Sequence, residues 1–79
     1  MPTTQIELSE RALLGRLNRA LAREGEGKVI KVARYDSRLF QNFGRYYSVI
    51  NNTVQDWHID LQQWAREMNV IRPYERFAE

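Results

Sequence analysis

The first regular pattern in the chain is that of an amphipathic helix. Apolar side chains recur at the three- and four-residue spacing that places them on one helix face: Leu13, Leu14, Leu17, Ala20 and Leu21. Ser9, before this run, is a preferred N-cap residue, and Gly25, after it, is a preferred C-terminal stop. The sequence therefore predicts a helix between Ser9 and Gly25.

The next patterns are those of β-strands. Residues 28–35, KVIKVARY, are rich in β-branched side chains, which favour a strand. Residues 45–50 and 53–59 are also strand-like, and the Asn51-Asn52 step between them suits a two-residue turn because asparagine tolerates positive φ. The chain is thus expected to form three strands, of which the last two make a hairpin.

The position of the turn sets the register of this hairpin. Four cross-strand pairs are expected: Ile50 with Thr53, Tyr46 with Trp57, Tyr47 with Asp56 and Arg45 with His58. Side chains alternate along a strand, so the first two pairs share the face that carries Ile59, which is the better core. We therefore expect Tyr46 and Trp57 to be buried and Tyr47 to be exposed.

A second helix is predicted near the end of the chain. Asp60 is its N-cap, Gln63 follows three positions later in a capping-box relation, and an apolar face holds Leu61, Trp64, Ala65 and Met68. Asn69 and the Arg72-Pro73 step end it. Residues 36–44 allow two interpretations, either a helical turn between Ser37 and Gly44 or an ordered loop.

This order of elements predicts an α+β two-layer sandwich, α-β-β-β-α, in which two helices cover one face of a three-stranded antiparallel sheet. Residues 1–79 are expected to form a single domain, with residues 1–8 and 73–79 as flexible or loosely docked ends. A core this small is only marginally stable, which raises the possibility of a homodimer. The second sheet face is expected to be partly open.

The amino-acid composition limits which metals and cofactors the protein is expected to bind. The 79 residues include no cysteine and one histidine, so thiolate metal sites are excluded and no metal is expected. There is no phosphate-binding glycine loop, and we expect no cofactor. The first residues resemble no signal peptide and no apolar run is long enough to span a membrane, so a cytoplasmic protein without membrane contact is expected.

Charge is divided unevenly along the chain. Residues 1–46 hold nine Lys or Arg against five acidic residues, whereas residues 47–79 hold three against five. Two basic surfaces follow from the expected faces. The open sheet face should carry Lys31, Tyr35, Arg45 and Tyr47, and the solvent side of the first helix should carry a ridge of Arg16, Arg19 and Arg23. Flat rings beside cations are suited to unpaired bases and phosphates, so nucleic-acid binding is the leading hypothesis.

The order helix, three antiparallel strands, helix resembles that of the double-stranded-RNA-binding domain. That family has a lysine-rich start on its second helix, where this chain has DLQQWAR, with Asp60 at the cap and no lysine. The resemblance therefore extends to the order of elements and does not include this phosphate-binding residue pattern.

The alternative function is a protein-interaction or homodimerisation module. Its surface would be the open sheet face with Tyr35, Tyr47, Val49 and Val54. Catalysis is not expected: His58 and Asp56 lie two apart on one predicted strand, hence on one face, but no motif supplies a nucleophile. We therefore predict a small non-enzymatic binding protein.

Overall fold

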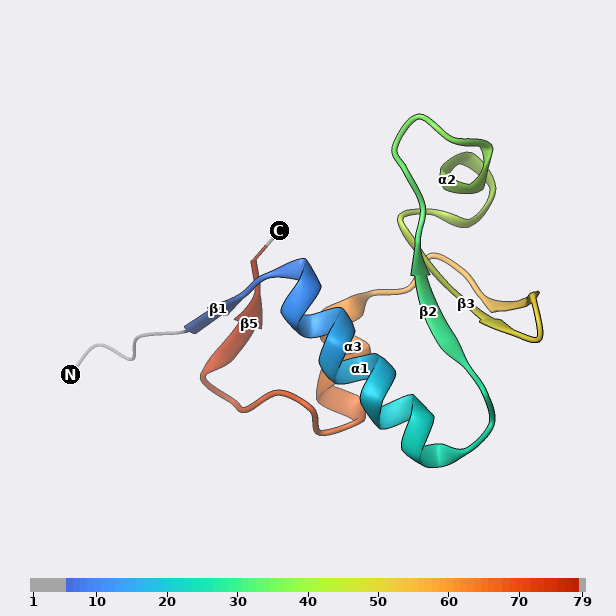
Figure 1. Ribbon diagram of the computed structural model, residues 1–79. Coiled ribbons are helices and arrows are strands. Elements are labelled where there is room, and N and C mark those ends of the chain that lie inside the picture. Colours follow the sequence, from blue (N-terminus) through green and yellow to red (C-terminus); the bar gives the residue numbers. More distant parts are fainter. Residues whose placement is uncertain (1–5, 79) are drawn as a thin grey trace.

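The computed structural model describes residues 6–78. Its elements are, in chain order, β1 (Ile6–Leu8), α1 (Glu10–Glu24), β2 (Val29–Val32), α2 (Arg38–Phe43), β3 (Tyr46–Ile50), β4 (Thr53–Asp56), α3 (Leu61–Glu67) and β5 (Glu75–Phe77). β2, β3 and β4 form the antiparallel sheet in that order, and β1 pairs with β5 in parallel. Helices α1 and α3 pack together, with the sheet on one side and the β1–β5 pair on the other (Figure 1). The predicted α+β fold with a three-stranded antiparallel sheet is confirmed, and the β1–β5 strand pair is an addition to it.

The core lies where α1 and α3 meet the inner face of the sheet. Leu13, Leu17 and Leu21 of α1 are buried there with Ile30 of β2 and Leu61 of α3. The starts of both helices are capped by the residues that the sequence predicts, whereas α3 ends at Glu67, earlier than expected. The Ser9 hydroxyl accepts a hydrogen bond from the Ala12 N–H, and the Asp60 carboxylate accepts one from the Gln63 N–H.

Residues 36–44 form the helical alternative. Helix α2 begins after Ser37, whose hydroxyl accepts a hydrogen bond from the Phe40 N–H, and ends at Gly44. Gly44 has φ of 78°, and a Cβ built on it would lie 2.6 Å from Nδ1 of His58. Glycine at this position is therefore required both by the backbone conformation and by the close approach of His58.

The hairpin turn is confirmed, but the register beyond it is not. Asn51 and Asn52 have positive φ and place Ile50 opposite Thr53. A bulge follows, so that Asp56 lies opposite Ser48 and not opposite Tyr47. The fully buried Ser48 hydroxyl donates to the Asp56 carboxylate at 2.6 Å and accepts from the Asp56 N–H at 3.1 Å, and these two bonds stabilise the shifted register.

This bulge explains why Trp57 is not in the core. The expected pairing of Trp57 with Tyr46 is wrong, because β4 ends at Asp56 and Trp57 is 57% exposed. Ile59 takes the core position, and its N–H donates to the Tyr46 carbonyl. The expected pairing of Arg45 with His58 is wrong too: His58 has φ of 54° and its N–H donates to Phe43.

The two ends of the described chain lie side by side. Ile6 pairs with Glu75 and Leu8 with Phe77, so the segments expected to be loosely docked contain hydrogen-bonded strands. Leu8 is buried, and Phe77 packs against the core. Between α3 and β5 the chain turns at Asn69, which has φ of 56°. This return path brings the end of the chain next to α1.

Candidate nucleic-acid interface

The three arginines predicted as a ridge on α1 line one hollow. Arg16, Arg19 and Arg23 surround it together with Met68, Asn69 and Val70, which follow α3, and its volume is about 280 Å³. A second hollow of about 420 Å³ adjoins it, because Arg16, Asn69 and Val70 line both. Arg72 and Glu75 complete that second hollow. We call these two adjoining hollows, lined by Arg16, Arg19, Arg23, Asn69 and Arg72, the arginine groove.

The groove lies on the side of α1 that faces away from the sheet. On one side of the helix, the Asn18 side chain bonds to the backbone of Ile30 in β2. On the other side, Arg16 donates to the Val70 carbonyl at 3.2 Å. Arg19 and Arg23 follow Arg16 by three and seven residues and therefore share its side. The ridge predicted from the spacing is thus present, and the segment after α3 forms the opposite wall.

Glu75 is the one carboxylate that lines the groove among the described residues, and its charge is compensated. Arg16 binds it with two hydrogen bonds of 2.9 and 3.1 Å, and the Arg72 N–H donates to it at 2.8 Å. Glu75 is only 6% exposed. The hydrogen bonds from Arg16, and then that from the Arg72 backbone, hold the pKa of Glu75 below its usual value. The groove therefore keeps an excess of positive charge.

Arg19 and Arg23 have free guanidinium groups. Both are exposed, and within residues 6–78 neither forms a salt bridge or a side-chain hydrogen bond. By contrast, Arg34 pairs with Asp36, and Arg76 pairs with Glu7. Arg19 and Arg23 can therefore bind an anion without first giving up a partner.

The sheet-face candidates divide into two groups. Lys31 and Tyr47 lie opposite each other in β2 and β3 on the outer face, with the Phe43 ring 5.9 Å from that of Tyr47. Trp57 follows the inward-facing Asp56, so it belongs to this outer face. A row of valines, Val29, Val49 and Val54, crosses the same face. Lys31 is the one cation among these residues.

Tyr35 and Arg45 belong to a different cluster. The Arg45 guanidinium lies 4.3 Å from the Tyr35 ring and donates to the Ala33 carbonyl at 2.7 Å and to the Glu10 carboxylate at 3.2 Å. The Tyr46 hydroxyl donates to the same carboxylate at 2.5 Å. Burial of Tyr46, and then its hydrogen bond to Glu10, raise the pKa of its phenol. Arg45 thus joins the start of α1 to the sheet, whereas Tyr35 is 70% exposed.

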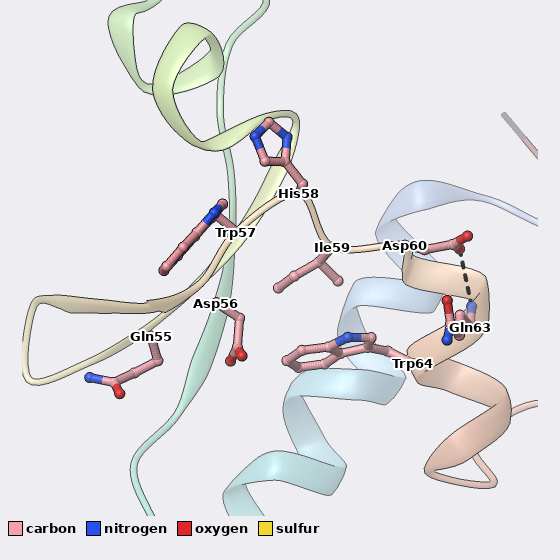
Figure 2. A pocket seen from close by; sticks show the side chains of 8 residues that line it. All are labelled: Gln55, Asp56, Trp57, His58, Ile59, Asp60, Gln63 and Trp64. Atoms are coloured by element: carbon pink, nitrogen blue, oxygen red, sulfur yellow. Dashed lines mark hydrogen bonds between the residues drawn. The ribbon is translucent and has the colours of Figure 1, made fainter.

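A pocket that the sequence did not predict opens beside β4. Its volume is about 340 Å³, and it is lined by Gln55, Asp56, Trp57, His58, Ile59, Asp60, Gln63 and Trp64. Figure 2 shows that the Asp56 side chain points toward Trp64, whereas His58 points away from Asp56. Asp56 also pairs with Lys28 at 3.2 Å, and its pKa is lowered, mainly by the Ser48 hydrogen bond. The expected placement of His58 and Asp56 on one strand face is therefore wrong.

Several residues of these sites could not be found from local sequence patterns. Asn69 and Arg72 reach the groove only because the chain turns back toward α1 after α3. The exposure of Trp57 depends on the bulge, for which no local signal exists in the sequence. The spacing of the three α1 arginines, by contrast, is a local signal, and it predicts that they lie on one side of the helix.

Comparison of the chain with protein-family models, with curated proteins and with solved structures finds no match. The site must therefore be interpreted from its own chemistry. Across residues 6–78, no group of three or more histidine, cysteine or acidic side chains could hold a metal ion. In the same part of the chain, no helix has the length and apolar character needed to cross a membrane.

Proposed function

We propose that the protein binds nucleic acid and that the arginine groove holds the sugar-phosphate backbone. The observation that carries this proposal is the pair of adjoining hollows lined by Arg16, Arg19, Arg23 and Arg72, whose one lining carboxylate among the described residues, Glu75, is already bound by Arg16. Phosphate contacts of this kind supply most of the sequence-independent affinity for nucleic acids.

The dimensions of the groove support this ligand class. Arg16 and Arg23 are seven residues apart on α1, which corresponds to about 10 Å along the helix axis. This length exceeds the size of one phosphate group, so the groove can contact more than one phosphate of a strand. A chain of phosphates therefore fits the groove better than a single anion does.

The outer sheet face is a second candidate contact within the same function. Lys31 and Tyr47 are paired there, and Trp57 adds an indole that is 57% exposed. Unpaired bases stack on such rings, with about 1–3 kcal/mol per base. Arg45 is a weaker candidate than the sequence suggested, since its guanidinium already binds Glu10 and the Ala33 carbonyl.

The test is a binding titration at several salt concentrations. Fluorescence anisotropy would follow a labelled single strand and a labelled duplex of 20 nucleotides, with wild-type protein and with the double variant Arg19→Gln/Arg23→Gln. Each lost phosphate contact should lower the slope of log affinity against log salt by about one, so the double variant should lose about two for the duplex.

A matched control keeps the net charge of the variant. Arg34→Gln/Arg38→Gln also removes two exposed arginines, but these lie at and before α2, outside the groove. This control should bind like the wild type, apart from a small uniform loss at low salt. Equal loss in both double variants would mean that only net charge matters, and absence of binding by the wild type would refute the proposal.

A further inference from the structure

The two edges of the three-stranded sheet differ in whether their outward-facing backbone groups are already hydrogen-bonded. At the β2 edge, the Asn18 side chain of α1 pairs with the Ile30 backbone, accepting from its N–H at 2.8 Å and donating to its carbonyl at 3.4 Å. The amide group therefore takes the place of a neighbouring strand. An edge whose outward-facing groups are satisfied in this way resists further pairing.

The β4 edge has no such cover. β4 is the last strand in the order β2-β3-β4, and no other segment of residues 6–78 is hydrogen-bonded to its outer side. Thr53 faces Ile50 across the turn, so its backbone groups point toward β3. The N–H and carbonyl of Val54, one residue later, therefore point outward. They are free to pair with an extended chain.

The pocket beside β4 lies directly at this open edge. Figure 2 shows it between the end of the hairpin and the start of α3, with Asp56, Ile59 and Trp64 around the opening. Trp64 packs against the core but stays half-buried. In a two-layer sandwich, a fourth strand at this edge would cover the gap between the sheet and α3.

We propose that an extended segment of a partner protein pairs with β4 as a fourth strand. One of its inward-facing side chains, large and apolar, enters the pocket and contacts Trp64 and Ile59. Its backbone bonds to Val54, and an outward-facing side chain lies beside Trp57. Of the two acidic residues that line the pocket, Asp56 is paired with Lys28 at 3.2 Å, whereas Asp60 forms no salt bridge within residues 6–78. A basic residue next to the inserted side chain therefore complements Asp60.

This occupant fits better than a second copy of the chain or a nucleic acid. If β4 of a second copy paired antiparallel around Val54, its inward-facing residues would be Thr53 and Asp56, and neither is a large apolar side chain that could fill a pocket with two indoles. Phosphates would meet the carboxylate of Asp60, which no cation pairs within residues 6–78. The surface is separate from the arginine groove, so this inference does not depend on the proposed nucleic-acid binding.

The experiment is a selection from a displayed library of random ten-residue peptides, with the wild-type protein as bait and the Val54→Pro variant for counter-selection. Proline lacks the outward N–H, and it is tolerated on edge strands where that N–H faces solvent. Val54→Thr keeps both the N–H and the β-branched shape and serves as the matched control. Enriched peptides should alternate apolar and basic residues and should bind Val54→Thr like the wild type.

A second measurement leaves the protein unchanged. In an NMR titration, the selected peptide of highest affinity, made synthetically, should shift the amide signals of Val54 and Asp56 and the indole signals of Trp57 and Trp64. N-methylation of every second amide of the peptide backbone should lower its affinity at least tenfold. Failure to enrich any peptide, equal binding to Val54→Pro, or equal binding of the N-methylated peptide would each overturn the inference. Arg19→Gln/Arg23→Gln should bind the peptide normally whether or not the nucleic-acid proposal holds.

Discussion

The helix side and the sheet side of the molecule present opposite chemistry. The arginine groove combines guanidinium groups with a single lining carboxylate that is neutralised within the described structure. The outer sheet face presents valines, Tyr47 and Trp57 with one lysine, and the pocket beside it has acidic residues. The net charge of the chain is only +2, and this total does not reveal that basic and acidic residues gather on different surfaces. Two surfaces of such different character are suited to two different ligands.

The largest effect on stability is expected from substitution of Trp64, and substitution of the exposed Trp57 provides the comparison. Trp64→Ala removes an indole that packs against the core and should lower the free energy of unfolding by about 2–4 kcal/mol. Trp57→Ala removes an exposed indole and should cost less than about 1 kcal/mol. Chemical denaturation followed by circular dichroism measures both. Equal losses would show that Trp57 is buried, and the sheet side would then lack its exposed ring.

Glu75→Gln is expected to change affinity and stability in opposite directions. It removes the carboxylate that binds Arg16, so the groove becomes more positive, and affinity for a 20-nucleotide duplex at low salt should rise about three- to tenfold. The melting temperature should fall, because the Arg16 guanidinium loses its charged partner.

Glu67→Gln is the control for this experiment. Glu67 is an exposed residue of α3 that accepts a hydrogen bond from Gln63, and it does not line the groove. Its substitution changes the net charge by the same amount, so it should raise affinity only slightly. A decrease in duplex affinity for Glu75→Gln would contradict the placement of phosphates along Arg16.

Acid should destabilise the protein through Glu75 and Asp56. The pKa values of both carboxyl groups are lowered in the folded protein from ordinary values of 4.5 and 3.8. Their contribution to stability is therefore complete above those ordinary values and is lost as the pH falls through the lower folded values. Denaturation midpoints measured from pH 7 down to pH 2 should fall steeply below about pH 4.5, and less steeply in Glu75→Gln. An unchanged slope in that variant would count against the Arg16–Glu75 pair.

Local signals in the sequence predicted most of the fold. The helix caps and the hairpin turn act within a few residues, at Ser9, Asp60 and the Asn51-Asn52 step. Their effect can therefore be recognised from the neighbouring residues alone. The bulge could not be recognised, since it depends on a hydrogen bond between Ser48 and Asp56 across the hairpin. The parallel pairing of β1 with β5 joins opposite ends of the chain and has no local signal either.

The same distinction applies to the candidate sites. The spacing of Arg16, Arg19 and Arg23 places them on one side of a helix by geometry alone, and the structure brings them together. The sheet-face prediction depended on register and was only partly met. Lys31 and Tyr47 are paired, whereas Arg45 is used within the fold and Trp57 replaces it at the surface. Predictions based on helical period were thus more robust than those that needed strand register.

The smallest expected effect concerns the fluorescence of Trp57 and tests whether the two sides act together on one strand. In Trp64→Phe, Trp57 is the remaining indole. A six-nucleotide single strand that occupies the arginine groove should leave its emission nearly unchanged, because the groove faces away from the sheet. A 20-nucleotide strand is long enough to pass around the molecule, whose chain trace is 16 Å in its shortest dimension, and should quench Trp57 modestly. Strong quenching by the short strand, unchanged in Arg19→Gln/Arg23→Gln, would place the primary contact on the outer sheet face, with Lys31 and Tyr47.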